Sequence, residues 1–237
     1  MRRRSVLLLL LALACLVVAP VVHASDGNWR VFVLVAYDEE WHTIANILYG
    51  YTAEELALVL IHSINDRFYI FDIYFSPAEY TFWDSADDPE SYNEMMDEVL
   101  AETNFNNQGY KWVLIAFTGQ GIPGAWGVCD WAYGAVLVEH AYLNGVGQAT
   151  DNILQHELSH LYDAPDHDEA DLDCVMNNYD YWIGFPWYYK VPTALVTANW
   201  CDDCKTVINE NNDWWGSWQE GGSGGGGGTI DLYPVKH

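Results

Sequence analysis

Short apolar runs alternate with amphipathic stretches along most of this chain. The runs are rich in β-branched and aromatic residues, which is typical of strands, and residues 112–118 are apolar throughout, as expected of a strand buried on both faces. Apolar positions at helical spacing predict helices over residues 41–64, with interruptions, and 91–103. Strands alternating with helices indicate an α/β (α+β) fold, with helices packed on a twisted mixed sheet. The predicted strands are residues 30–36, 68–75, 112–118 and 134–140.

A further helix is predicted over residues 149–161. Thr150 or Asp151 offers an N-cap, and Pro165 stops the helix soon after its end. One face of this helix is apolar and predicts that the helix packs on the sheet, which leaves the opposite face free to border a cleft. The apolar face is formed by Leu154, Leu158 and Leu161.

The opposite face of this helix carries His156, Glu157 and His160. Two histidines four residues apart project from one side of a helix, so their imidazoles can share one metal ion. The glutamate can then reach a water on that metal, which is the arrangement of hydrolytic zinc sites. The alternative is a surface helix with ordinary histidines and a solvated glutamate, and it requires all three residues to coincide by chance.

Catalytic zinc usually has three protein ligands, and Asp166 and His167 follow the helix after one turn. Here the chain resembles the metzincin metalloproteases, most of all the short secreted bacterial and archaeal members, whose motif continues to a third ligand in the register of Asp166. Met176, within Cys-Val-Met-Asn, looks like the methionine turn of that family, a packing residue beneath the metal. The resemblance implies a metzincin-like fold and a catalytic site with one Zn²⁺ ion, held by His156, His160 and Asp166, with Glu157 as general base.

One position departs from the family pattern. Asp163 stands where glycine is usual, at a turn that needs a left-handed backbone. Aspartate tolerates that conformation better than most residues, so we expect the turn to form and Asp166 to be the third ligand, with His167 as the alternative. The resemblance also makes Tyr179 a possible oxyanion helper, although packing is the more common use of an aromatic residue there.

The first residues of the chain indicate export. Three arginines at 2–4 precede an apolar run from 6 to 22, and small residues lead up to Ala24. This pattern predicts a secretory signal peptide over residues 1–24 and a secreted mature protein, exported by the general or the twin-arginine route. An uncleaved membrane anchor is the alternative, and the run is barely long enough for one.

Acidic residues dominate the composition, with 34 Asp and Glu against 9 Lys and Arg and a net charge of −25. Such a charge excludes nucleic acid as a natural partner and disfavours anionic membranes. We expect no stable membrane insertion after signal cleavage, and a monomer. The acidic stretch 84–90 lacks the pattern of a calcium loop and reads as a solvated loop.

Four of the five cysteines lie after the predicted signal peptide: Cys129, Cys174, Cys201 and Cys204. Outside the cell an even number predicts two disulfides, with Cys174 bonded to Cys201 or Cys204. The alternative is a second zinc site, in which the Cys-x-x-Cys pair joins Cys174 and His167, similar to the cysteine site of one cytosolic metzincin branch.

The chain therefore divides into a signal peptide (1–24), a metzincin-like catalytic domain (25–219, with an upper part to about 165 and a lower part from 166) and a Gly-rich flexible tail (220–237). The resemblance suggests that residues 124–131 form the edge strand that binds substrate, and the alternative is that the glycines and tryptophans there belong to a loop. The sequence predicts a secreted zinc endopeptidase acting on protein or peptide substrates. The alternatives are a zinc hydrolase of a non-peptide substrate and a non-catalytic secreted surface protein that keeps a structural zinc.

Overall fold

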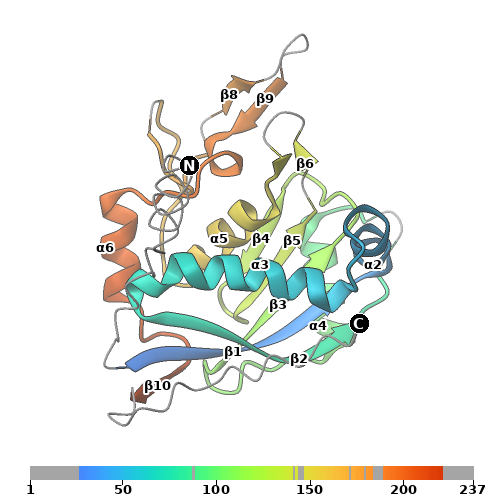
Figure 1. The fold of residues 1–237 in the computed structure, drawn as a ribbon, viewed down its shortest axis with the longest axis horizontal. Helices are drawn as coiled ribbons and strands as arrows, with labels where there is room; N and C mark the ends of the chain where they lie inside the picture. The colour runs from blue at the N-terminus through green and yellow to red at the C-terminus, as the bar shows by residue number, and fades with distance from the viewer. Residues whose placement is uncertain are drawn as a thin grey trace, which may run out of the picture. The chain divides into compact units, whose positions relative to one another are not determined.

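A six-stranded mixed sheet is the centre of the fold in the computed structural model (Figure 1). Five strands follow the order β10-β1-β3-β5-β4. The sixth, β2, also pairs with β1 but lies outside this order. β1, β2, β3 and β5 are parallel, whereas β4 and β10 are antiparallel to their neighbours β5 and β1. The strands are β1 (Gly27–Tyr37), β2 (Ile73–Phe82), β3 (Trp112–Thr118), β4 (Gly127–Asp130), β5 (Ala135–Glu139) and β10 (Ser217–Glu220). The structure describes residues 27–86, 89–140, 142–143, 147–170, 172–178, 180–183 and 189–220.

Helices connect and cover the strands. The α-helices are α2 (Glu39–Ile44), α3 (Ala53–Phe68), α4 (Tyr92–Thr103), α5 (Thr150–His160) and α6 (Asp202–Glu210). Shorter helical turns are the π-helical η1 (Ala45–Tyr49) and the 3₁₀ turns η2 (Tyr69–Phe71) and η3 (Thr193–Leu195). Two small hairpins pair β6 (Tyr142–Leu143) with β7 (Gly147–Gln148) and β8 (Asp180–Ile183) with β9 (Tyr189–Pro192).

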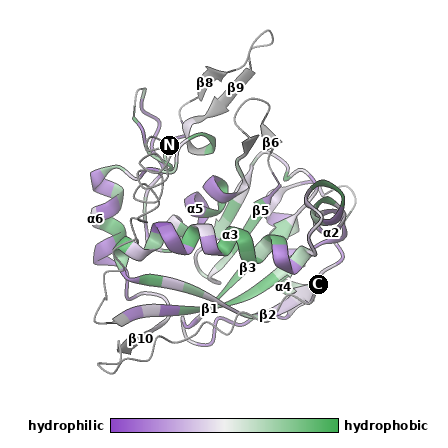
Figure 2. Cartoon of the chain, in the orientation of Figure 1, coloured by the Kyte–Doolittle hydropathy of each residue, from purple (hydrophilic) through white to green (hydrophobic). Residues whose placement is uncertain are grey.

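The sheet is buried on both faces, which explains why β3 is apolar throughout. Val113, Ile115 and Phe117 belong to the core shared with α3 and α5, whereas Leu114 and Ala116 belong to the core shared with α4. Successive strand residues point to opposite faces, so both sets must be apolar. The central strands are accordingly the most hydrophobic part of the chain in Figure 2.

Polar contacts hold α3 against its neighbours on one face of the sheet. The Asn65 side chain donates to the Phe75 carbonyl at 2.9 Å and accepts from the Phe75 N–H at 2.8 Å, which fixes α3 to β2. Arg67 forms an ion pair with Asp151 and donates to Gln155, both in the first turns of α5. α3 therefore helps to set the position of α5, the helix with the histidines.

The α/β prediction is confirmed, with differences in detail. The strand expected at 68–75 begins at Ile73, since Phe68 ends α3 and Phe71 ends η2, and both are apolar because they are buried in the core. The interruption expected within the helix at 41–64 lies at Gly50, where φ is 68°. The last helix, α6, spans Asp202–Glu210 and has no counterpart among the helices predicted above.

The predicted signal peptide and almost all of the Gly-rich tail lie outside the described residues, so both stay predictions. Among the described helices, no single one is long and apolar enough to cross a membrane, and one bent pair, Glu39–Tyr49 with Ala53–Phe71, meets the length and composition criteria together.

Candidate metal centre

His156 and His160 lie on one side of α5 with their Nε2 atoms 3.2 Å apart. The other ring nitrogen of each histidine has a carbonyl partner: Nδ1 of His156 lies 2.8 Å from the Val175 oxygen, and Nδ1 of His160 lies 2.9 Å from the Ala164 oxygen. A carbonyl only accepts, so Nδ1 of each ring is the donor. Nε2 is then the nitrogen of each ring that faces the centre, and a metal ion that binds there replaces any proton it carries.

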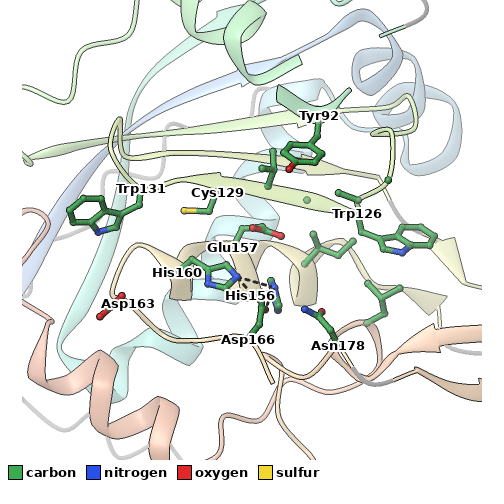
Figure 3. Close-up of a pocket in the computed structure, with 16 residues that line it drawn as sticks. Tyr92, Trp126, Cys129, Trp131, His156, Glu157, His160, Asp163, Asp166 and Asn178 are labelled. Carbon is green, nitrogen blue, oxygen red and sulfur yellow. Dashed lines mark hydrogen bonds and ion pairs between the residues drawn. The ribbon is translucent and has the colours of Figure 1, made fainter. Parts of the chain in front are cut away.

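Asp166 brings a third donor to the same point. Its Oδ1 lies 3.3 Å from the His156 Nε2 and 3.5 Å from the His160 Nε2 (Figure 3). His167, the alternative third ligand, is directed elsewhere: its Nε2 lies 3.1 Å from the Cys204 Sγ. The structure therefore brings together the donor set His156, His160 and Asp166 that sequence analysis favoured.

The turn that returns Asp166 to the helix depends on Asp163. Its φ is 64°, the left-handed conformation expected at this position. The Asp163 N–H donates to the His160 carbonyl at 3.0 Å, and the Ala164 N–H donates to the Ser159 carbonyl at 3.2 Å. These two bonds and the left-handed residue form a Schellman motif at the end of α5. The substitution of glycine by aspartate leaves the turn intact.

The three donor atoms fit one zinc ion. Zinc binds imidazole nitrogen and carboxylate oxygen at about 2.0–2.2 Å, so two such donors around a tetrahedral ion are about 3.3–3.5 Å apart. The three distances here are 3.2, 3.3 and 3.5 Å. Two imidazoles and a carboxylate are also an ordinary donor set for catalytic zinc, in which a fourth position stays open.

Charges at the centre act strongly on one another. Burial lowers the pKa of His156. The hydrogen bond to Asp166 and the neighbouring carboxylates outweigh burial, and the net effect raises this pKa to about 9. Burial raises the pKa of Asp166, and the two histidines outweigh that effect and hold it well below its usual range. Burial also raises the pKa of Glu157, against the opposing effect of the histidines. Glu157 is thus a carboxylate with increased proton affinity.

The methionine turn lies in the same core as α5, and its Val175 carbonyl is the partner of His156. Met176 is fully buried in the same core as α5. The backbone around it makes two bonds with His167: the His167 N–H donates to the Met176 carbonyl, and the Asn178 N–H donates to the His167 carbonyl, each at 2.8 Å. Tyr179 lies outside the described residues, and its helper role stays a prediction.

The cysteines differ from the prediction of two disulfides. All four described cysteines are free, so the two predicted disulfides are not formed. Cys174, Cys201 and Cys204 gather around His167 instead, with the Cys174 and Cys204 sulfurs 3.8 Å apart, well beyond a disulfide bond. Cys129 lies on β4, where burial and the charges of Glu157 and Asp130 raise the pKa of its thiol.

A cavity of about 870 Å³ lies between β4 and the histidine face of α5. In Figure 3, Glu157 and the histidines border it from α5, and Trp126 and Trp131 flank it near the two ends of β4. Both tryptophans belong to the edge strand expected over residues 124–131, and β4 itself is shorter, Gly127–Asp130. Tyr92 and Asn178 also line the cavity. They were not predicted, because no sequence pattern distinguishes them from packing residues.

A mixed α/β fold and a helix with His-Glu-x-x-His beside an outer antiparallel strand together define the metzincin-like class. The family model Reprolysin_5, metallo-peptidase family M12, matches residues 28–189, and the chain belongs to this family. Family membership makes it a metallopeptidase and implies a zinc cofactor. No curated protein matches the chain.

The solved structures that match the chain include the following two. One is the zinc-dependent peptidase from Methanocorpusculum labreanum (strain Z), with 10% identity and a TM-score of 0.47 over 75% of this chain and 100% of that one. The other is titled "Structure of a chaperone-substrate complex", with 12% identity and a TM-score of 0.47 over 78% of this chain. The chain spans about a third of that second protein's length, since the match covers 34% of it.

Proposed function

We propose that this protein is a secreted zinc-dependent endopeptidase. The observation that carries the proposal is the position of Glu157, a buried carboxylate that lines the same cavity as two histidines whose Nε2 atoms face the centre. A metal held only for stability needs no such base and tends to be closed by a fourth protein ligand.

His156, His160 and Asp166 would hold the ion. Their donor atoms are already at zinc spacing, and the carbonyls of Val175 and Ala164 keep both imidazoles in the required orientation and tautomer. When bound, zinc supplies a Lewis acid that polarises the scissile carbonyl and makes a neighbouring water more acidic.

Glu157 is assigned the proton transfers. Its raised pKa makes it a better base than an exposed glutamate, and the neighbouring histidines keep its ionised form accessible. It takes a proton from the attacking water and then gives that proton to the amine that leaves when the peptide bond breaks. Both transfers require only that the carboxylate faces the cavity, as Figure 3 shows.

The substrate is assigned to the cavity side of β4. Within the described residues β4 pairs with β5 alone, so its other edge has backbone groups that an extended peptide can bind as an added strand. Trp126 and Trp131 offer apolar contact surface on either side of the metal centre. Secretion rests on the signal-peptide pattern of residues 1–24.

The test compares Glu157→Gln with the native chain on casein and on a peptide library. Loss of general-base catalysis predicts a fall in kcat of about 10²–10⁴-fold. Zinc content by mass spectrometry is expected to stay unchanged, because Glu157 is not a ligand. Cleavage that survives in a zinc-loaded Glu157→Gln chain would show the mechanism to be wrong. A zinc-loaded native chain that cleaves no peptide would favour a different substrate or a non-catalytic role.

A further inference from the structure

Three cysteines and one histidine meet beside the candidate metal centre but take no part in it. Donor atoms of His167, Cys174, Cys201 and Cys204 all lie within 4.8 Å of one another. The His167 Nε2 lies 3.1 Å from the Cys204 Sγ and 3.4 Å from the Cys201 Sγ, and the Cys174 Sγ lies 3.8 Å from the Cys204 Sγ.

The sulfur–sulfur distance matches an edge of a tetrahedron around one zinc ion, and the two sulfur–nitrogen distances are slightly shorter than such an edge. With zinc–sulfur bonds of about 2.3 Å and a zinc–nitrogen bond of about 2.0–2.1 Å, two sulfurs are about 3.8 Å apart and a sulfur and a nitrogen about 3.6 Å apart. A disulfide needs sulfurs at about 2.05 Å, which would pull Cys174 and Cys204 together and exclude His167 from the cluster. The cluster is arranged as a coordination shell.

We propose that His167, Cys174, Cys201 and Cys204 bind a second zinc ion, and that this ion holds Asp166 in position for the first. Three sulfurs and one imidazole suit zinc, and four protein donors complete its tetrahedral shell. No position is left for water or substrate, so the second ion is structural. Its binding replaces the three thiol protons, which leave to solvent.

Local structure prepares the cluster for a metal. Cys201 is the N-cap of α6, and Cys204 follows at the third helical position, so the first turn of α6 brings both sulfurs to the positive end of the helix. The Cys201 N–H donates to the Cys174 Sγ at 3.3 Å. Cys174 and Cys204 are fully buried, and buried thiolates need a positive partner such as a metal ion.

Two pairs of consecutive residues connect this cluster with the catalytic centre. Asp166 belongs to the centre and His167 to the cluster. The second pair is Cys174 and Val175. Cys174 belongs to the cluster, and the Val175 carbonyl orients His156. The His167 backbone is bonded to Met176 and Asn178, so the two connecting segments form one rigid unit. A metal in the cluster therefore restrains both Asp166 and the partner of His156.

Metal content tests the second site without reference to activity. The full secreted chain is expected to contain two zinc ions by mass spectrometry, and Cys204→Ser one. His160→Ala is also expected to contain one ion, which remains in the cysteine cluster. After exchange with Co²⁺, sulfur-to-cobalt charge-transfer absorption is expected in the native and His160→Ala chains and not in Cys204→Ser.

His167→Cys is the matched control, because it keeps four donors. It is expected to retain two zinc ions and to show stronger charge-transfer absorption, which supports the site even where Cys204→Ser fails to fold. One zinc ion per native chain, or thiols that react with an alkylating agent only after reduction, overturns the proposal.

The restraint on Asp166 is tested by competition with a chelator for the first zinc ion. In Cys204→Ser, affinity at the first site is expected to fall about 10–100-fold, the usual effect of losing support behind a ligand, whereas His167→Cys is expected to restore it. Unchanged affinity in Cys204→Ser overturns this part of the proposal. A chain that holds two zinc ions and cleaves no peptide supports the second site and contradicts the proposed function.

Discussion

Gly127 on β4 lies directly against Glu157 on α5. A Cβ at Gly127 would lie 2.7 Å from the Glu157 Oε1 and 2.8 Å from its Cγ, distances that real side chains do not tolerate. The absence of a side chain at this one position lets the outer strand approach the helix closely. The space for the Glu157 carboxylate is thus defined by the strand assigned to substrate.

Gly127→Ala is expected to displace Glu157 without removing a metal donor. We expect kcat for peptide cleavage to fall at least about tenfold, since small displacements of a catalytic group are costly, while zinc content stays native. Steady-state kinetics and metal analysis would check this. Gly121→Ala is the control, because nothing lies within 4 Å of a Cβ there. Native kcat in Gly127→Ala would mean that Glu157 relaxes without loss of function.

Asp163→Gly is expected to stabilise the protein by about 0.5–1 kcal/mol, because glycine adopts the left-handed conformation without steric cost. It also removes a negative charge at the C-terminal end of α5, where the helix dipole disfavours one. Denaturant unfolding at constant zinc would measure the change. Asp163→Asn separates the two causes, because it removes the charge and keeps the side-chain size. A lower midpoint for Asp163→Gly would contradict the expectation.

Glu139 is expected to make stability depend on pH. Burial raises its pKa to about 7, against the hydrogen bond from the Ile122 N–H, so the folded chain favours the protonated form. A raised folded pKa gives stability that is fully present below about pH 4.5 and is lost as pH rises through about 7. Glu139→Gln should remove this loss and exceed the native chain in stability above pH 7. Parallel native and variant profiles of unfolding midpoint against pH would refute this assignment.

The indole of Trp200 has a polar partner in Ser159: its Nε1–H donates to the Ser159 Oγ at 2.9 Å. Ser159→Ala leaves a buried indole N–H without this acceptor, which typically costs about 1–3 kcal/mol. A double-mutant cycle that combines Ser159→Ala with Trp200→Phe tests whether the hydrogen bond causes that loss of stability. If the bond is responsible, the double variant loses less than the sum of the single variants in chemical unfolding. Strict additivity would assign the loss to packing alone.

The features that were predicted best from the sequence are those that depend on a single secondary-structure element. The spacing of His156 and His160 depends only on helical geometry, and the left-handed turn at Asp163 follows from the position of the helix end. Both features are present in the structure. Asp166 followed from register with a family motif, and the structure places its oxygen beside both imidazoles.

Long-range relationships were less predictable. Nothing in the sequence shows that the Val175 carbonyl orients His156, because any backbone carbonyl can accept a hydrogen bond. Whether the cysteines form disulfides or gather around His167 depends on the position of α6 relative to His167. The disulfide prediction rested only on the expected extracellular compartment. The apolar run at Phe68 fits the buried end of a helix as well as it fits a strand.

The open edge of β4 can pair with any extended chain, including a second copy of the same protein. Two features oppose such self-pairing. β4 spans only Gly127–Asp130, so a strand–strand contact between copies gains few hydrogen bonds. The net charge of −25 also makes copies repel each other at low ionic strength. A strand this short in a strongly acidic chain therefore resists pairing with a second copy, which limits aggregation at high protein concentration.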